Sequence, residues 1–511
     1  MAGSPSGRKV VIGLDVGTTA AKVSAFALGD DWRASAVNEY PLLQPQPGWE
    51  VQDPEVIWRA LREGLAEVAA ECGDAQVVGI GASTAMHGLI GLDADQRPLT
   101  PLLTWADSRA AEQAVKLRDT ELGRRLHQTS GTPIHSMSHL TKLLWYSVHD
   151  PETMRQVRWW VGLKDFVLLQ LTGELVTEVS NASGTGMLDL KTRDWNPEAL
   201  QVTGLTADRL PPVRPTTDSL PLRADLADEL GLPRDLPVVL GAGDGPLGNL
   251  GVGALESGVV GLSIGTSGAV RMITDRPYVD AGGKLFCYNL AEGAWVIGGA
   301  ISNGGIVVRW GADVFGADFA DEPGGNPDGM LLELARDVPI GADGLVMLPF
   351  LMAERAPLWN PTIPGAYFGV RRSHTRAHFV RAAIEGVALM LSTIVGELDR
   401  AAPIRQIRAT GGVFRSTVWR DVLTGALGKP LVVTDGAEGT ALGAAALTLF
   451  ALGEASSLRD GLLQLGQDPS VGGDEHVPSD QDVAAYAAVR AGIPGLLAGY
   501  DEVARLFGRP A

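Results

Sequence analysis

The feature that most restricts the fold of this chain is a strand–turn–strand pattern that occurs twice. The first copy runs through the apolar stretch 10–14, turns at Gly17 and returns over 22–28. The second copy runs through 259–264 and turns at Gly265. Self-similarity at so long a separation indicates an internal duplication and predicts two related halves. Aligning the two glycines pairs Leu14 with Leu262, Val16 with Ile264, Thr18 with Thr266, Thr19 with Ser267 and Ala21 with Ala269.

Further strand-like runs lie between helical segments, and each is followed by glycine. They cover 77–81, 237–240 and 404–410. Strands that alternate with helices predict an α/β fold. We expect amphipathic helices at 54–71, 110–123, 378–398 and 417–427, small-residue helices at 247–255 and 438–452, closing helices over 486–506, and loops at 210–221 and 322–329.

Composition excludes several classes of protein. The 60 acidic and 42 basic residues give a net charge of -18, which disfavours a nucleic-acid binder. Cys72 and Cys287 are the only cysteines in the 511 residues, which favours a reducing compartment without disulfides. No apolar run reaches about 18 residues, and the N-terminus lacks the apolar core of a secretory signal. We therefore expect a cytoplasmic protein with no membrane or nucleic-acid partner.

The first turn, Asp15-Val16-Gly17-Thr18-Thr19, has the chemistry of a phosphate loop. Glycine allows the backbone to approach a phosphate, and hydroxyls and N–H groups can surround it. Asp15 could hold Mg²⁺, which accepts one or two carboxylates and keeps several waters. A plain hairpin turn is the alternative, but the second copy at Gly265-Thr266 favours a pair of phosphate loops. The second copy carries Ser263 in place of the carboxylate.

Gly241-Ala242-Gly243-Asp244-Gly245 follows the strand at 237–240. It is not a dinucleotide fingerprint, because Pro246 stands where the third glycine would be needed. Asp244 is instead an acidic residue at a helix start. It can cap that helix or accept a proton from a substrate hydroxyl, and the phosphate loops favour the second role.

Two other segments have the chemistry of a polyol site. His87 lies beyond a strand end, where loops of open α/β sheets contact ligands, although a buried structural histidine is the alternative. One loop combines an aromatic ring, a carboxylate and a guanidinium, in Trp105, Asp107 and Arg109. The alternative interpretation is a surface ion pair between the carboxylate and the guanidinium. The pairs His135/His139 and His374/His378 have helical spacing but no third ligand, so we expect no metal there.

Together these motifs resemble the FGGY family of carbohydrate kinases, within the actin/hexokinase-type ATPases. Residues 365–370, 378–379 and 382–385 look like the second signature of the family, and 354–360 matches a family loop. Residues 137–148, around Lys142 and Trp145, approximate the first signature and depart from it at His139. The match preserves motif order over nearly the whole chain. It implies an α/β fold of two actin/hexokinase-like (ribonuclease H-like) domains that flank a deep interdomain cleft.

Within the family the sequence is most similar to the gluconokinases. The carrying segments are 85–87, 104–109, 131–135, 286–288, 295–299 and 303–310. This implies ATP-dependent phosphorylation of D-gluconate to 6-phosphogluconate. A xylulokinase-like pentulose or polyol kinase remains the alternative, because xylulokinases share Met86-His87. A sugar-sensing regulator is a third class, but both Asp15 and Asp244, which a degenerate kinase would lose, are present.

The resemblance also implies a division of labour along the chain. Residues 1–245 would bind the sugar acid or polyol and 246–511 the nucleotide, with the helices 247–255 and 439–452 as the crossing about which the halves close. Asp244 would be the catalytic base and Asp15 the Mg²⁺ residue, and a homodimer is left open. The implied substrate contacts are Met86, His87, Trp105, Asp107, Arg109 and His135, with Met137 as a further pocket candidate. The implied ATP contacts are Gly17, Thr18, Thr19, Lys22, Gly265, Thr266, Gly305, Arg309, Gly412 and Ser416.

Overall fold

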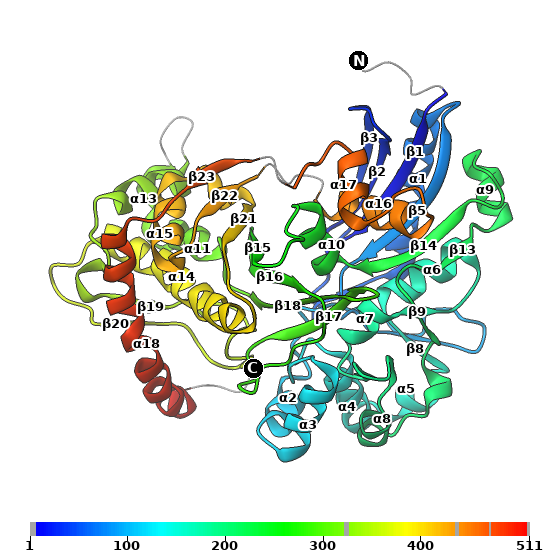
Figure 1. Ribbon diagram of the computed structural model, residues 1–511. Coiled ribbons are helices and arrows are strands. Elements are labelled where there is room, and N and C mark those ends of the chain that lie inside the picture. Colours follow the sequence, from blue (N-terminus) through cyan, green and yellow to red (C-terminus); the bar gives the residue numbers. More distant parts are fainter. Residues whose placement is uncertain (1–6, 321–325, 435–438, 470–471, 508–511) are drawn as a thin grey trace. The chain divides into compact units, whose positions relative to one another are not determined.

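The computed structural model describes residues 7–320, 326–434, 439–469 and 472–507. The chain forms two compact units, each assembled from three segments (Figure 1). The first unit consists of Met1–Leu255, Ile273–Ile297 and Ala437–Val471, and the second of Glu256–Met272, Gly298–Gly436 and Gly472–Ala511. The division therefore differs from the single boundary expected near residue 245, because the chain returns to the first unit twice.

The first unit is built on a six-stranded sheet of order β13-β14-β5-β1-β2-β3. β1 and β2 form the predicted hairpin, in which Asp15 pairs with Lys22, and β1 is parallel to β5. Apolar residues of these strands are buried with α1, which packs on β2 and β3, while α16 packs on β1 and β5 (Figure 1). The bounds are β1 Lys9–Val16, β2 Ala20–Ala27, β3 Arg33–Glu39, β5 Gln76–Thr84, β13 Ser219–Pro221, β14 Pro237–Gly243, α1 Pro54–Cys72 and α16 Gly439–Ala451.

The two predicted small-residue helices do pack closely, but both lie in the first unit, whereas the sequence predicted them as a crossing between the two halves. α10 (Asp244–Gly251) begins earlier than expected, directly at Asp244. A Cβ added to Gly251 would lie 1.6 Å from the Gly439 carbonyl oxygen, and one added to Gly443 would lie 2.0 Å from that of Leu247. Only glycine permits such a close approach of two helix backbones.

A second core of the first unit carries the loops that the sequence links to the substrate. The single helix expected over 110–123 is wrong, because the structure has α2 (Ala111–Arg118) and α3 (Glu121–Ser130) instead. Thr120 starts α3 by accepting the Gly123 N–H. The remaining elements here are β4 Val51–Gln52, β6 Ile90–Leu92, β7 Leu102–Leu103, α4 His139–His149, α5 Pro151–Gln156, β8 Trp159–Val161, α6 Leu163–Thr172, β9 Thr177–Glu178, α7 Val179–Ser183, β10 Leu188–Asp189, β11 Asp194–Trp195, α8 Pro197–Thr203, β12 Val213–Arg214, α9 Ala224–Leu230 and β17 Phe286–Ala291.

The second unit repeats the strand–turn–strand pattern. β15 (Val259–Ile264) and β16 (Gly268–Thr274) form a hairpin, and β15 is parallel to β21 (Gln406–Thr410). The strands run in the order β18-β16-β15-β21-β22-β23, with β18 at Ala294–Ile301, β22 at Leu431–Val433 and β23 at Asp474–His476. The other elements are α11 Ile306–Phe315, α12 Ala317–Ala320, α13 Pro327–Arg336, β19 Val346–Leu348, β20 Ala366–Phe368, α14 Arg376–Ala401, α15 Thr417–Leu427, α17 Leu458–Gln464 (in the first unit) and α18 Asp480–Phe507.

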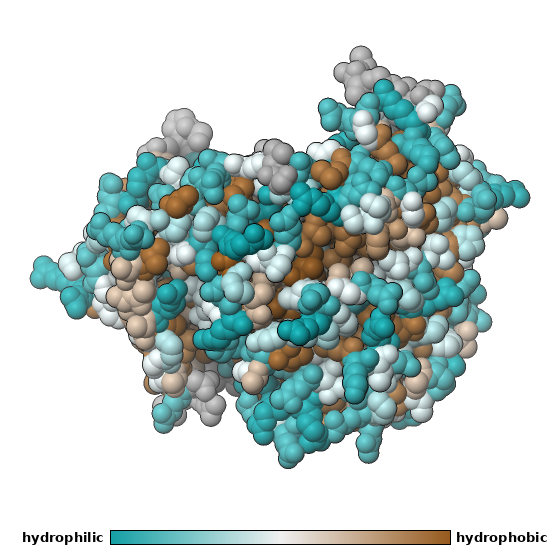
Figure 2. Space-filling model, in the orientation of Figure 1, coloured by the Kyte–Doolittle hydropathy of each residue, from teal (hydrophilic) through white to brown (hydrophobic). Residues whose placement is uncertain are grey.

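α14 is the described helix that has the length and apolar composition of a membrane span, and 83% of its apolar window is buried. It packs against α13, α15 and β19, as a core helix of a folded unit does. Figure 2 shows that the visible face of both units is mostly covered by hydrophilic residues. The expected loops contain short elements: 210–221 includes β12 and β13, and 322–329 includes the start of α13, while 322–325 lie outside the described residues.

Candidate active site

Asp15 stands at the end of the central strand β1, just before the turn that the sequence predicts as a phosphate loop. Neighbouring side chains hold this turn: the Tyr40 hydroxyl donates to the Gly17 carbonyl at 2.6 Å, and the Gln52 amide donates to the Thr18 carbonyl at 2.7 Å. Trp105 Nε1 donates to Thr18 Oγ1 at 2.9 Å. The predicted sugar loop therefore touches the predicted phosphate loop directly, as a transfer site requires.

Asp244 follows the end of β14, where the strand is distorted. Val239 is opposite Gly81 and Ala242 is opposite Ser83, so two residues of β14 face one residue of β5. Such a β-bulge bends the strand and redirects the residues after it. Gly241 makes the bulge possible, because its φ is +73° and a Cβ there would lie 1.8 Å from the Ala82 carbonyl oxygen.

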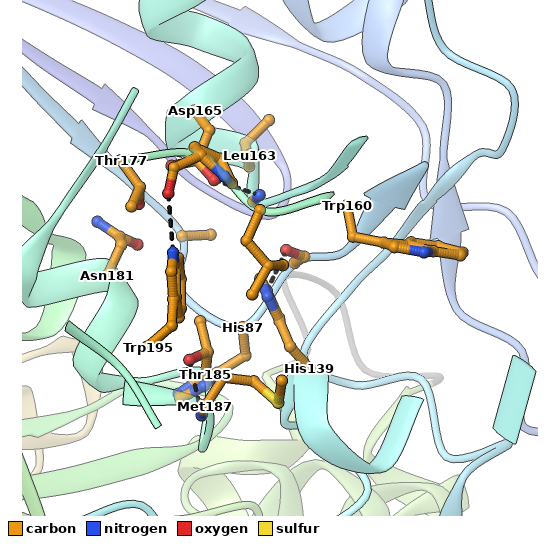
Figure 3. Close-up of a pocket in the computed structure, with 15 residues that line it drawn as sticks. His87, His139, Trp160, Leu163, Asp165, Thr177, Asn181, Thr185, Met187 and Trp195 are labelled. Atoms are coloured by element: carbon orange, nitrogen blue, oxygen red, sulfur yellow. Dashed lines mark hydrogen bonds between the residues drawn. The ribbon is translucent and has the colours of Figure 1, made fainter. Parts of the chain in front are cut away.

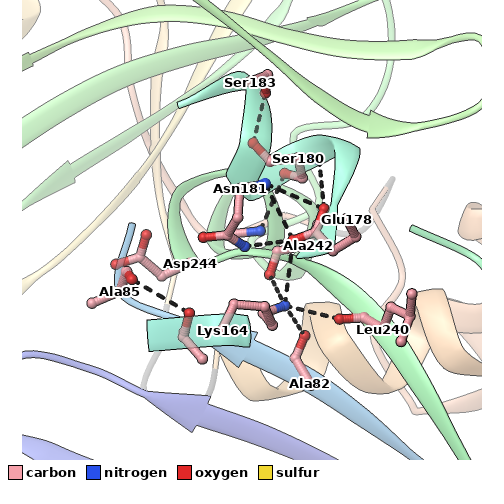
Figure 4. Close-up of polar contacts among 12 residues, drawn as sticks. Ala82, Ala85, Lys164, Glu178, Ser180, Asn181, Ser183, Leu240, Ala242 and Asp244 are labelled. Carbon is pink, nitrogen blue, oxygen red and sulfur yellow. Dashed lines mark hydrogen bonds and ion pairs between the residues drawn. The ribbon is translucent and has the colours of Figure 1, made fainter. Parts of the chain in front are cut away.

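A buried ammonium group fills this bulge. Lys164 Nζ, on α6, donates to the carbonyls of Ala82 at 2.6 Å, Leu240 at 2.9 Å and Ala242 at 2.9 Å (Figure 4). It also pairs with Glu178 at 3.6 Å, and both side chains are fully buried. Burial lowers the pKa of Lys164 to about 8, while the carboxylates of Glu178, Asp165 and Asp244 oppose that shift.

Asp15 and Asp244 influence one another electrostatically. Burial, together with the negative charge of Asp244, raises the pKa of Asp15 to about 7, and Lys22 opposes this shift. Two carboxylates that repel each other in a half-buried place attract a cation. Mg²⁺ needs only one or two carboxylates besides waters and phosphate oxygens, so these residues fit it. The described residues contain no cluster of three metal-ligating side chains, and such a cluster is not what Mg²⁺ at a phosphate site needs.

His87 is held in the left-handed region of the backbone, with φ of 68°. Its Nδ1 lies 2.8 Å from the Gly184 carbonyl oxygen, so this nitrogen carries the proton and donates. In the neutral ring its Nε2 is then an acceptor, and it lies 3.5 Å from the Tyr288 hydroxyl. Met86 packs beside it, so that a Cβ on Gly243 would lie 2.5 Å from the Met86 sulfur. Met86 thus lies against Gly243, the residue that precedes Asp244.

A second buried lysine holds together the His87 loop and the Trp105 loop, called the sugar loops below because the sequence predicts that they contact the substrate. Lys142 Nζ, on α4, donates to the carbonyls of His87 at 2.7 Å, Leu103 at 3.2 Å and Thr104 at 2.8 Å. Burial lowers the pKa of Lys142 to about 7. Since Leu103 and Thr104 immediately precede Trp105, one ammonium group connects the His87 loop with the Trp105 loop.

Asp107 and Arg109 form a buried pair. Arg109 donates from Nε at 2.9 Å and from a terminal nitrogen at 2.8 Å to the two oxygens of Asp107, whose side chain is 0% exposed. The guanidinium lies 3.6 Å above the ring of Trp49 and 5.1 Å from that of Trp145. The Glu50 N–H also donates to Asp107 at 3.0 Å. The Arg109 guanidinium therefore binds the Asp107 carboxylate of the protein itself. This favours a bracing role for Arg109 over direct contact with a substrate carboxylate.

His135 and Met137 are buried next to each other, and the Met137 N–H donates to His135 Nδ1 at 3.2 Å. A small cavity lies nearby, lined by His87, His139 and Asp165 among others (Figure 3). Its volume of about 10 Å³ has room for one water molecule and not for a sugar. His135, Trp105 and Arg109 do not line this cavity.

All the ATP contacts expected in the second unit line one cavity. Its volume is about 770 Å³, which suits a nucleotide-sized molecule. The N–H of Gly305 donates to the Gly265 carbonyl at 2.7 Å, so the two loops are in contact. Charged side chains at the rim include Arg309, which pairs with Asp328 at 3.0 Å. The expected contacts that line this cavity are Gly265, Thr266, Gly305, Arg309, Gly412 and Ser416.

Sequence reasoning assigned no role to several residues that build the site, although Lys142 and Tyr288 lie in segments that carry the family resemblance. Lys164 and Lys142 each interrupt an apolar helix, and a lysine in such a place was the available signal. Ser180, whose Oγ accepts the Gly243 N–H at 3.2 Å, gave no signal because serine is common in loops. Tyr288 and Trp49 lie far along the chain from their partners, so only tertiary structure reveals them.

Comparison with known proteins places the whole chain in one family. Residues 10–251 match the N-terminal domain of the FGGY family of carbohydrate kinases, and residues 260–452 match its C-terminal domain. The chain is 39% identical over 453 residues to a gluconokinase from Bacillus subtilis (strain 168), which covers 88% of each chain. It is 31% identical to a xylulose kinase from Escherichia coli (strain K12), covering 93% of this chain and 96% of that one.

Among solved structures, the chain is similar to a gluconate kinase from Lactobacillus acidophilus. The TM-score is 0.87 at 31% identity, covering 97% of this chain and 98% of that chain. The fold is thus that of a two-domain carbohydrate kinase with actin/hexokinase-like architecture. The chain belongs to the FGGY family of carbohydrate kinases, and it is a phosphotransferase that acts on a sugar-type alcohol group.

Proposed function

We propose that this kinase transfers the γ-phosphoryl group of ATP to the 6-hydroxyl of D-gluconate and forms 6-phosphogluconate. The observation that carries the proposal is the placement of Asp244 at the bulged end of β14, beside Asp15 and the sugar loops. Similarity to the gluconokinase of Bacillus subtilis, at 39% identity against 31% for the xylulose kinase, supports gluconate as the acceptor.

In this mechanism the sugar hydroxyl attacks phosphorus while Asp244 accepts its proton. The new O–P bond forms as the bond from phosphorus to the bridging oxygen of ADP breaks. Phosphoryl transfer demands mostly positioning and charge stabilisation, so the protein contributes alignment above all. His87 Nε2, as an acceptor, would take a hydrogen bond from a substrate hydroxyl, and Trp105 would lie against the carbon chain.

We propose that Gly17, Thr18, Thr19 and Lys22 contact the phosphates from the first unit. Gly265, Thr266, Gly305, Arg309, Gly412 and Ser416 would hold the nucleotide in the second unit. Asp15 would hold Mg²⁺ through water, and this cation supplies neutralisation of the phosphate charge when bound. Met86 and His135 stay substrate-contact predictions. Asp107 and Arg109 act here as the brace of the Trp105 loop.

The test is an ATP-dependent screen of gluconate, xylulose, ribulose and glycerol, read as ADP release and as phosphorylated product. We expect gluconate to have the highest kcat/KM. A higher value for xylulose would overturn gluconate and favour the pentulose alternative, which the 31% identity to the xylulose kinase keeps open. The cytoplasmic location and the homodimer stay predictions.

A further inference from the structure

Two fully buried lysines in the first unit perform the same structural task at two different places. Each ammonium group donates to three main-chain carbonyls that belong to two separate segments of the chain. Lys142 joins the loop of His87 to the strand end before Trp105. Lys164 joins β5 to the bulge of β14 before Asp244.

A buried ammonium group costs free energy unless every donor is satisfied. Lys164 meets this condition, because its donors reach Ala82, Leu240 and Ala242 and its charge faces Glu178. The Glu178 carboxylate is itself bound by the N–H groups of Ser180 and Asn181. The ionisable groups that face Lys164 are Glu178, the adjacent Asp165 and Asp244.

The position of these carbonyls explains what the lysine does. A β-bulge leaves carbonyls without ladder partners, and those of Leu240 and Ala242 converge with that of Ala82. Asp244 follows Ala242 by only two residues, so the direction of the Asp244 side chain depends on the shape of this bulge. A second hydrogen bond, from the Gly243 N–H to Ser180 Oγ, holds the same strand end.

We infer that Lys164 is the positioning residue of the Asp244 base, and that Lys142 is the corresponding positioning residue of the sugar loops. The inference rests on the proposed function, since it takes Asp244 as the base. It predicts that loss of the two lysines affects different kinetic parameters. Loss of Lys164 misplaces the base and lowers kcat, whereas loss of Lys142 displaces substrate contacts and raises the KM for the sugar.

The experiment compares Lys164→Met with Lys142→Met in the full chain. Both variants remove a buried cation that holds three carbonyls, so each is the matched control for the other, and we expect thermal midpoints below that of the wild type in both. For Lys164→Met we expect kcat to fall about 100-fold, because misplacement by about 1 Å can cost that much, with the gluconate KM nearly unchanged. For Lys142→Met we expect the gluconate KM to rise about tenfold with kcat nearly unchanged.

Equal changes of the same parameter in both variants, or a KM effect confined to Lys164→Met, would overturn the inference. If Lys164→Met does not fold, Ser180→Ala tests the same strand end. It should lower kcat up to about tenfold, the value of one hydrogen bond. Its control is Ser183→Ala on the same helix, because the Ser183 hydroxyl donates to the Ser180 carbonyl and accepts the Asn289 N–H, and neither partner belongs to β14. An unchanged kcat in Ser180→Ala would then overturn the inference.

Failure of the proposed function gives a different result. If the wild type does not phosphorylate gluconate, the substrate proposal fails. The lysine variants are then compared on the polyol that the screen identifies, where the same separation of kcat from KM is expected.

Discussion

At the scale of single residues, the site depends on where a carboxylate stands and on what surrounds it. Asp244 is the first residue of α10, and its Oδ1 accepts the N–H of Gly245 at 2.7 Å. Asp107 is also a carboxylate of this unit, but Arg109 and two backbone N–H groups saturate it. In the proposed mechanism, the same side-chain chemistry therefore serves catalysis at Asp244 and bracing at Asp107.

We expect Asp244→Asn to lower kcat by about 10²–10⁴-fold, the usual range for a general base, while gluconate and nucleotide still bind. The amide keeps the shape of the side chain but cannot take the proton. Steady-state kinetics and calorimetric titrations check this. Asp225→Asn is a matched control, because Asp225 lies in the first turn of α9 and its side chain is 69% exposed. Near-normal turnover of Asp244→Asn would contradict the assignment.

Arg109→Met should reduce kcat/KM for gluconate and for neutral polyols in similar proportion. The guanidinium braces Asp107 and lies against Trp49, so its loss leaves a buried carboxylate without its cation. Breaking such a pair costs about 3–5 kcal/mol of stability, which thermal unfolding would detect. A loss confined to gluconate would instead show that Arg109 binds the substrate carboxylate.

The burial of His139 predicts that the free energy of unfolding depends on pH. Its Nε2 donates to the Gly88 carbonyl at 2.7 Å, and burial, aided by the charge of Lys142, lowers its pKa to about 3. The unfolded chain, with a histidine pKa near 6.5, binds the proton more tightly. Stability should therefore fall as the pH drops from about 6.5 towards 3, by at most about 1.4 kcal/mol per pH unit for this one proton.

Denaturant midpoints of the wild type and of His139→Gln, measured between pH 4 and 8, test this. The variant should have a lower midpoint at neutral pH and a flatter decline in acid. Parallel curves for the two proteins would show that His139 does not account for the acid sensitivity.

At the scale of elements, the contact between α10 and α16 depends on the absence of side chains. A Cβ on Gly443 would lie 2.0 Å from the Leu247 carbonyl oxygen, and nothing there is a flexible side-chain end that could move aside. Since α16 also packs on β1 and β5, a displaced α16 would disturb the strands that carry Asp15.

We expect Gly443→Ala to destabilise the protein by about 1–3 kcal/mol or more, the usual cost of overpacking. Gly396→Ala on α14 is the matched control, because no atom outside its own helix lies within 4 Å of its added Cβ. That change should stabilise the protein by about 0.4–1 kcal/mol. Thermal unfolding of the two variants measures both effects, and equal midpoints would contradict the argument.

At the scale of the whole molecule, the expected residues gather separately in each unit. Asp15, Asp244 and the sugar loops belong to the first unit, and the 770 Å³ cavity belongs to the second. In the proposed reaction, transfer from a nucleotide in the second unit to a sugar in the first requires that the bound molecules meet. Closure would also exclude the water that otherwise hydrolyses ATP.

We therefore expect gluconate together with a non-hydrolysable ATP analogue to reduce the radius of gyration measured by solution scattering. Either ligand alone should give a smaller change. Hydrogen exchange at α10 and α16 should slow at the same time. An unchanged radius and unchanged exchange with both ligands bound would rule out closure.

Much of this architecture follows from local sequence. The apolar run before Gly17 and its repeat before Gly265 are strong strand signals, and both hairpins are confirmed. The helix at 417–427 is confirmed to the residue, since Gly428 ends it in the left-handed conformation. The helix expected over 110–123 was wrong, because the cap at Thr120 starts a new helix inside one apolar pattern.

What the sequence by itself determined is the family, the duplicated α/β halves and the residue types that bear the chemistry, because these depend on neighbours along the chain. What only the tertiary structure decided is how those residues are used. The Arg109 fork binds Asp107 because buried charges must be paired where they fall. Lys142 and Lys164 reach carbonyls 38 to 82 residues away, and no local pattern encodes such distant partners.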